Sequence, residues 1–133
     1  MSFFIWKPEY SVGVMEFDAD HKKLTDILSR LYNGVWDEKN SIPRAFGEFS
    51  DYILEHFAHE EELMAKLNYP KYGEHKKEHD RCLASVRAYQ SRLDRGEKLD
   101  PVEVCRFFQN WLEKHTTGMD KKYTSFFNAR GIK

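Results

Sequence analysis

Apolar residues recur at intervals of three and four positions in four separate stretches of the chain. This spacing places side chains on one face of an α-helix, and no stretch shows the strict alternation typical of a half-buried strand. Short polar breaks separate the four stretches. The apolar positions expected to face inward are Leu24, Ile27, Leu28, Leu31 and Val35; Phe46, Phe49, Ile53, Phe57 and Met64; Tyr72, Cys82, Val86 and Tyr89; and Val104, Phe107, Phe108, Trp111 and Leu112.

The ends of the four predicted helices carry residues that suit helix termini. Asp18 or Asp20 can cap the first helix, and Ser41 can cap the second. Pro70 suits the first turn of the third helix, and Asp100 precedes a proline at the start of the fourth. Because short connections favour antiparallel neighbours, the pattern predicts an all-α fold, an up-down-up-down antiparallel four-helix bundle.

The sequence outside these helices is expected to pack onto the bundle. We expect one domain over residues 1–133, in which residues 1–18 form an extended N-terminal arm and residues 19–128 form the four-helix bundle. Helical spacing resumes after Gly118, which predicts a short C-terminal helical segment. The aromatic residues expected to anchor the arm are Phe3, Phe4, Trp6, Tyr10 and Phe17.

Composition and charge narrow the range of functions. With 133 residues, 15% of them aromatic, the chain can bury a single core. The formal net charge of −1 gives no reason to expect nucleic acid or an anionic membrane as a partner. No apolar run reaches the length of a membrane span and the start lacks the features of a secretory signal, so we expect a cytoplasmic protein. Cys82 and Cys105 are expected to be free, buried thiols.

Each of the four apolar stripes contains at least one histidine. Glu60 shares a helix face with His56, and His79 shares one with His75. A single buried histidine is most often a core residue with a hydrogen-bond partner, but histidines converging from four helices favour a metal site, because buried polar groups are costly unless paired or coordinated. His59 is expected at the surface or rim. The inward polar set is His21, His56, Glu60, His75, His79, His115 and Asp120.

His115 and Asp120 stand five residues apart, which is not a same-face spacing in a regular α-helix. Five steps of about 100° leave the two side chains roughly 140° apart. Both can point inward only if the helix widens into a π-bulge or breaks, and Gly118 makes either tolerable. We therefore predict an irregularity at Thr116–Met119.

The spacing of these polar residues resembles the di-iron pattern of the hemerythrin family. The likeness covers nearly the whole chain, and all seven ligand positions of the pattern are filled. Any one pair would be a weak signal, whereas the full set is specific. The matching motifs are Asp18-x-x-His21, His56-Phe57-x-x-Glu60-Glu61, Met64, Tyr69-Pro70, His75-x-x-x-His79 and His115-x-x-x-x-Asp120.

The resemblance implies two non-haem iron ions per chain, joined by an oxo or hydroxo bridge and by two carboxylates. Counting donors then fills an octahedron on the first iron and leaves one position open on the second. The same imidazole and carboxylate donors would also suit zinc or manganese. The implied ligands are His75, His79 and His115 on the first iron, His21 and His56 on the second, and Glu60 and Asp120 as bridges.

The resemblance implies reversible O2 binding at this open position, with no catalytic residue and no enzyme activity. Di-iron oxidases use more carboxylate ligands, which help to stabilise high-valent iron, whereas five imidazoles favour a site that releases O2 again. The residues implied to wall the open position are Leu24, Phe57, Trp111 and Leu112. Plain core packing would suit the same four residues. Tyr123 is expected to hydrogen-bond a bridging carboxylate.

Other functions of the same site stay open at this point. Oxygen, redox or nitric oxide sensing would need a separate signalling partner, a weak peroxidase would show turnover, and iron storage would need more metal than one dinuclear centre. A carrier, store or supplier of O2 ranks first, with an oxygen-consuming enzyme as the recipient. The sequence does not fix the oligomeric state, and it favours a monomer.

Overall fold

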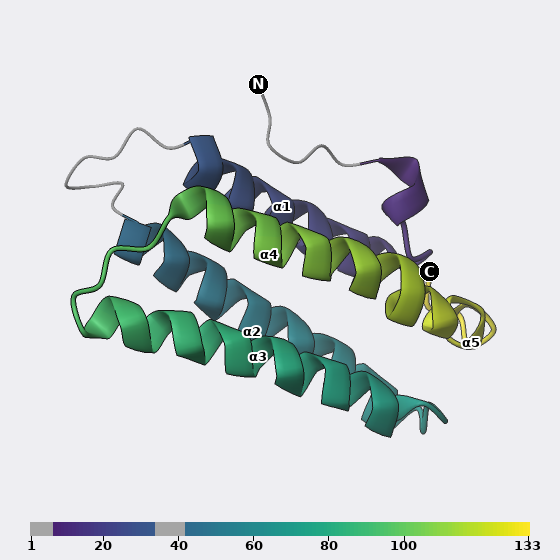
Figure 1. Cartoon of the computed structure of the whole chain (residues 1–133). Helices are drawn as coiled ribbons and strands as arrows, with labels where there is room; N and C mark the ends of the chain where they lie inside the picture. Colours follow the sequence, from purple (N-terminus) through teal and green to yellow (C-terminus); the bar gives the residue numbers. More distant parts are fainter. Residues whose placement is uncertain (1–6, 34–41) are drawn as a thin grey trace.

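A computed structural model describes residues 7–33 and 42–133 of the chain. These residues are mostly helical (Figure 1). A short 3₁₀ turn, η1 (Pro8–Tyr10), comes first, and three short helical segments follow the fourth long helix. The long helices are α1 (Met15–Asn33), α2 (Ile42–Lys66), α3 (Tyr72–Asp94) and α4 (Pro101–Lys114), and the segments after them are η2 (His115–Met119), η3 (Asp120–Tyr123) and α5 (Thr124–Asn128).

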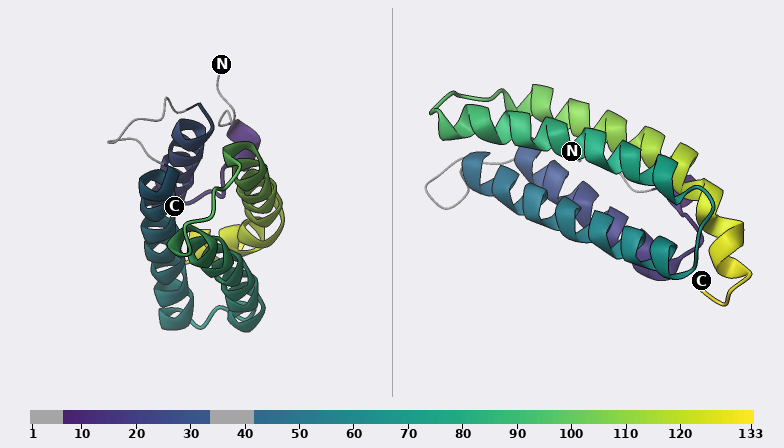
Figure 2. Two further views of the ribbon diagram at one scale, coloured as in Figure 1. Left: turned by 60° about the vertical axis from the view of Figure 1, so that its left-hand side comes forward. Right: turned by 90° about the horizontal axis from the view of Figure 1, so that it is seen from below.

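Consecutive long helices run in opposite directions (Figure 1). α1 lies against both α2 and α4, and α2 lies against α3. Figure 2 shows the four helices gathered into one bundle, with α5 at one end of it. The predicted all-α, up-down-up-down bundle is confirmed. None of the helices in the described residues is both long and apolar enough to span a membrane.

The first helix begins earlier than the sequence pattern predicts. α1 starts at Met15, so neither Asp18 nor Asp20 is its N-cap, and that prediction is wrong. The amide of Asp18 already bonds the carbonyl of Val14, at 2.9 Å, which makes Asp18 part of the first turn. Its carboxylate instead turns back and accepts a 2.8 Å hydrogen bond from the amide of Val12. Asp18 therefore fastens the segment that leads into the helix.

The other helix ends agree more closely with the prediction. Asp100 caps α4, because its carboxylate accepts a hydrogen bond from the amide of Val102. Asn68 ends the turn after α2 in a left-handed conformation, and Pro70 lies just before α3 rather than in its first turn. The predictions for five residues fall outside the described residues; these are Phe3, Phe4, Trp6, Val35 and Ser41.

Removing the cap of α4 should lower the free energy of unfolding by about 1 kcal/mol. The 2.9 Å bond to the carboxylate of Asp100 satisfies the Val102 amide, which has no acceptor inside the helix. Asp100→Ala should therefore lower the melting temperature by a few degrees in a thermal circular dichroism scan, whereas Asp100→Asn keeps an acceptor and should retain most of the stability. Equal losses in the two variants would contradict the capping role.

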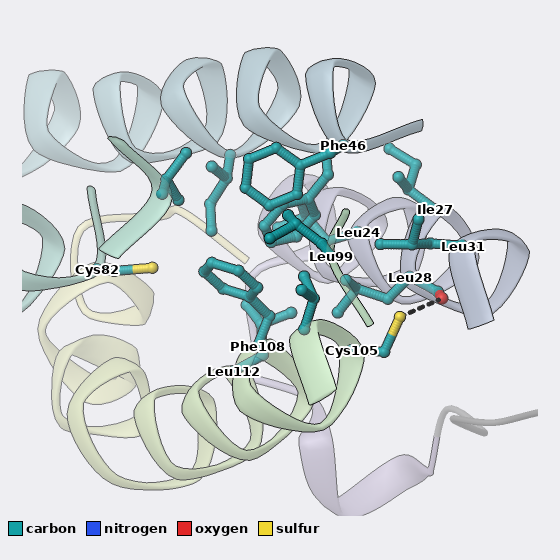
Figure 3. Packing of buried hydrophobic residues seen from close by; sticks show 14 of the residues in the cluster. Leu24, Ile27, Leu28, Leu31, Phe46, Cys82, Leu99, Cys105, Phe108 and Leu112 are labelled. Carbon is teal, nitrogen blue, oxygen red and sulfur yellow. Dashed lines mark hydrogen bonds between the residues drawn. The ribbon is translucent and has the colours of Figure 1, made fainter. Parts of the chain in front are cut away.

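The larger of two core clusters fills the space between the long helices (Figure 3). It contains Phe108, Leu112 and both cysteines. Cys82 and Cys105 are free and buried, as predicted. The thiol of Cys105 donates to the carbonyl of Leu28 at 3.5 Å, and burial raises its pKa to about 12. A buried, protonated thiol of this kind is inert packing.

The smaller cluster joins residues 12–17 and residues 123–127 to Met64 and Tyr69, at the end of α2 and in the turn that follows it. Phe17, expected to anchor the N-terminal segment, is fully buried in it, and the hydroxyl of Thr124 donates to the carbonyl of Val12. One inward prediction is wrong, because Phe107 is 41% exposed. Phe108 takes the inward position beside it, and a helix turns by about 100° between neighbours.

Candidate metal centre

The helices bring the seven predicted polar residues to one place. Each of the four long helices contributes, or leads directly into a segment that does. All seven are buried, with at most 5% of any residue exposed. Their donor atoms form two adjoining groups in which all atoms lie within 4.8 Å of one another. The groups are Glu60, His75, His79, His115 and Asp120, and His21, His56 and Glu60.

A π-helical turn places Asp120 in the site. η2 is a π-helix in which the carbonyl of His115 accepts a hydrogen bond from the amide of Asp120, five residues later. The predicted irregularity at 116–119 is thus confirmed, and the wider turn lets both side chains point inward. A Cβ on Gly118 would meet no atom of the described residues within 4 Å, so the turn does not need glycine for space.

The carboxylate of Asp120 faces histidines of both groups. Oδ1 lies 2.9 Å from Nε2 of His75 and 2.9 Å from Nε2 of His115. Oδ2 lies 3.2 Å from Nε2 of His21, on α1. One carboxylate with an oxygen toward each group has the geometry of a bridging ligand.

Glu60 also lies between the two groups. Its Oε1 is 2.9 Å from Nε2 of His56 and 3.5 Å from Nε2 of His79, and its Oε2 is 4.0 Å from Nε2 of His75. His56 stands on the same helix one turn earlier, whereas the other two stand on α3. The i,i+4 spacing from His56 and the packing of α2 against α3 place the Glu60 carboxylate where the two groups of donor atoms meet.

The chemistry of these atoms fits bound cations. Nε2 of His21 lies 2.9 Å from Nε2 of His56, although two neutral imidazoles can share only one proton in such a contact. Within the described residues, neither oxygen of Glu60 or Asp120 has a hydrogen-bond donor with standard geometry. Buried carboxylates without donors are costly, and a metal ion between nitrogen and oxygen atoms removes that cost. The donor set therefore fits metal ions.

Both central carboxyl groups are ionised. Burial and the nearby Asp120 act to raise the pKa of Glu60, but His56 and other histidines lower it well below its usual value. Burial also acts to raise the pKa of Asp120. The nearby histidines, His115 above all, outweigh burial and lower this pKa well below its usual value. Burial disfavours a charged His56, yet Glu60 raises its pKa to about 10. The site thus attracts positive charge, which a metal can supply in place of protons.

Two further carboxylates, which the sequence analysis missed, support the site from outside. Oδ2 of Asp20 lies 2.8 Å from Nδ1 of His56, and Oε2 of Glu61 lies 2.9 Å from Nδ1 of His79. When Nε2 binds a metal, Nδ1 carries the proton and donates it to such an acceptor. Asp20 precedes a predicted ligand and Glu61 follows one; Glu61 is also part of the matching motif, but the sequence did not indicate a supporting role for either residue.

Aromatic rings cover two of the histidines. Phe57 stacks on His79 with centroids 3.8 Å apart and planes at 7°, and Trp111 stacks on His115 at 4.4 Å and 14°. Trp111 and His115 also line a surface pocket of about 320 Å³, where the site comes close to solvent. Of the four predicted pocket residues, three are buried and one is partly buried; these are Leu24, Phe57 and Leu112, and Trp111.

Tyr123 lies fully buried beside the site. Burial, followed by the charges of Glu60 and Asp120, raises the pKa of its hydroxyl well above its usual value, so it stays protonated. Among the described residues the hydroxyl has no acceptor with standard hydrogen-bond geometry. The predicted bond to a bridging carboxylate therefore stays a prediction.

The fold and the site together define a helical-bundle metal protein, whose buried imidazole and carboxylate donors come from every part of the bundle. Comparison with known proteins identifies the family within this class. The sequence profile of the hemerythrin HHE cation binding domain matches residues 12–126. The chain therefore belongs to the hemerythrin family.

Bacterial relatives match most of the chain. A bacteriohemerythrin of Stenotrophomonas maltophilia is 28% identical over 130 residues, 97% of this chain and 84% of the relative. A bacteriohemerythrin of Clostridium acetobutylicum is 29% identical over 126 residues, 90% of this chain and 98% of the relative. The crystal structure of a wild-type hemerythrin superposes with a TM-score of 0.87 at 27% identity and covers 93% of this chain and 97% of its own.

Proposed function

We propose that this protein binds O2 reversibly at two iron ions held by the seven clustered residues. The observation that carries the proposal is the placement of Glu60 and Asp120, each of which faces histidines of both groups. Two carboxylates shared in this way suit two neighbouring metal ions. Membership of the hemerythrin family and the bacteriohemerythrin relatives favour iron as the metal and O2 as the ligand.

The proposed ligands divide unequally between the two ions. One group offers three histidines and the other offers two, while both carboxylates serve both. An ion held by two histidines would then keep a free position for a small molecule. The assignment is His75, His79 and His115 to one ion, His21 and His56 to the other, and Glu60 and Asp120 to both.

Two ferrous ions would supply the two electrons that reversible O2 binding requires. The protein must orient the imidazoles, hold their outer protons and keep water out. Asp20 and Glu61 hold the protons on Nδ1 of His56 and His79. Phe57 and Leu112 supply buried apolar surface beside the site, which limits access of water to the ions. No side chain has to act as a catalytic acid or base.

The test is a count of iron per chain, followed by anaerobic reduction, titration with O2 and flushing with argon under visible absorption. Two irons and a colour that appears with O2, fades under argon and returns would support the proposal. Direct passage to a stable ferric form would favour redox sensing or peroxidase chemistry instead.

Four further expectations stay predictions: the cytoplasmic location, the monomeric state, the single domain over 1–133 and an oxygen-consuming recipient.

Leu112→Ala should speed autoxidation about tenfold, which equals roughly 1.4 kcal/mol in the barrier, while iron per chain stays the same. Leu112 is 5% exposed, one turn before His115, and it contacts no metal in the proposed assignment. Truncation would open a path for water to the ions. The rate is measured as loss of the O2-dependent absorption. Leu28→Ala is the matched control, because Leu28 is buried in the same cluster and is not a predicted pocket residue. Equal acceleration of autoxidation in both variants would show that Leu112 does not specifically shield the ions from water.

A further inference from the structure

The five clustered histidines differ in what their Nδ1 atoms contact. The Nδ1 atoms of His56 and His79 each lie against a carboxylate. Nδ1 of His21, His75 and His115 has no such partner among the described residues. Each of the two metal groups therefore contains one histidine with a carboxylate behind it, and the two supporting carboxylates can be compared directly.

Asp20 is held by more than the ligand it supports. Its Oδ2 lies 2.8 Å from Nδ1 of His56 and 3.2 Å from Nδ1 of His59, and its Oδ1 accepts a 3.2 Å hydrogen bond from the hydroxyl of Tyr52. The ring of Phe17 lies edge-on to both histidines, at 6.0 and 4.9 Å. These contacts fix the position and direction of one carboxylate between two imidazoles.

His59 joins this arrangement to the surface. Its side chain is 40% exposed and that of Asp20 is 21% exposed, whereas the side chain of His56 is 1% exposed. The other ring nitrogen of His59, Nε2, lies 3.5 Å from the carboxylate of Glu16. The sequence placed His59 at the rim, and the structure confirms its exposure while giving it a contact that a plain surface residue would lack.

Glu61, the supporting carboxylate of the other group, has a weaker outer partner. Its Oε1 lies 3.5 Å from the ammonium group of Lys76, whose side chain is 44% exposed. Exposed ion pairs of this kind contribute little, because solvent screens them and long side chains lose entropy. Lys76 also contacts Asp80, so it is shared. Glu61 is therefore held less firmly than Asp20.

We propose that Asp20 and His59 act together as a positioning pair for His56, the ligand of the ion that keeps the open position. His59 fixes the carboxylate of Asp20, and Asp20 fixes the ring of His56 with its proton on Nδ1 and its Nε2 free. The identity of the metal and the open position rest on the proposed function; the positioning itself does not. Outer partners of this kind change metal affinity by about 10- to 100-fold.

The first test uses Zn²⁺ alone, in competition with a chromophoric chelator, on the full chain. Asp20→Asn should weaken one zinc site about 10- to 100-fold, and His59→Gln should weaken the same site by a smaller factor. Because His59 acts through Asp20, the double variant should be no weaker than Asp20→Asn alone. Glu61→Gln is the matched control and should weaken the other site.

Histidine ¹⁵N NMR of the zinc-loaded protein reports the Nδ1–H signal of each ligand separately. A general loss of stability would not change one of these signals selectively. The Nδ1–H signal of His56 should shift in both Asp20→Asn and His59→Gln, and it should stay in place in Glu61→Gln, which should shift the signal of His79. His59 is half-exposed, so His59→Gln tests the pair even where Asp20→Asn folds poorly. A wild-type zinc affinity and His56 signal in His59→Gln, or additive losses in the double variant, would overturn the pair.

The iron-loaded protein separates this proposal from the proposed function. If O2 binds reversibly, Asp20→Asn should raise the O2 concentration at half-saturation about tenfold, because a neutral partner makes His56 a weaker donor and favours the ferrous state. If O2 does not bind while the zinc and NMR patterns hold, the proposed function fails and the positioning pair stands. If O2 binds and those patterns are absent, the pair fails and the function stands.

Discussion

Asp120→Ala should remove most of the bound metal while leaving the four helices in place. The carboxylate of Asp120 is the one that comes within 3.2 Å of His21 on α1 and within 2.9 Å of His75 on α3. Its loss would take one donor from each proposed ion and leave the two groups joined by Glu60 alone. We expect the affinity for metal to fall at least 100-fold, beyond the 10- to 100-fold effect typical of an outer partner.

The measurement is metal per chain after gel filtration, with far-ultraviolet circular dichroism to check helix content. Asp80→Ala is the matched control, because Asp80 is an exposed aspartate on α3 that pairs with Lys76. The control should keep the full complement of metal. Two metal ions per chain in Asp120→Ala, at wild-type affinity, would show that Asp120 is not a ligand.

The helices could be predicted from sequence because their signal is local. Apolar residues repeat along each stripe, and Asp100 with the proline after it marks a helix start that the structure keeps. The start of α1 was misplaced because Val14 and Phe17 turn inward before the regular stripe begins. Phe107 was assigned inward because the pattern does not say which of two adjacent phenylalanines faces the core.

The clustering of the seven polar residues could be predicted for the same reason, since each motif spans only a few residues of the chain. The five-residue step from His115 to Asp120 even indicated the π-helical turn that the structure contains. The supporting residues could not be predicted, because the contact of Asp20 with His56 spans 36 positions and joins two helices. This contact depends on the position of α1 along α2, which local sequence patterns do not determine.

Removing the metal should lower the melting temperature by about 10–20 °C. A ligand that binds only the folded state at a thousandfold excess over its Kd contributes about 4.1 kcal/mol. For a chain of 133 residues, each kcal/mol corresponds to roughly 3–5 °C. The metal-free core would also have to keep two ionised, buried carboxylates beside five histidines, and repulsion between Glu60 and Asp120 already acts to raise the pKa of Glu60.

Differential scanning calorimetry of the protein before and after treatment of the reduced form with a chelator measures this shift. Adding ferrous iron back under argon should restore the transition, which separates loss of metal from damage. Asp120→Ala should show a much smaller shift, since it has already lost most of its metal. An equal melting temperature with and without metal would mean that the ions do not bind in the core, because a ligand bound there must stabilise the fold in proportion to its affinity.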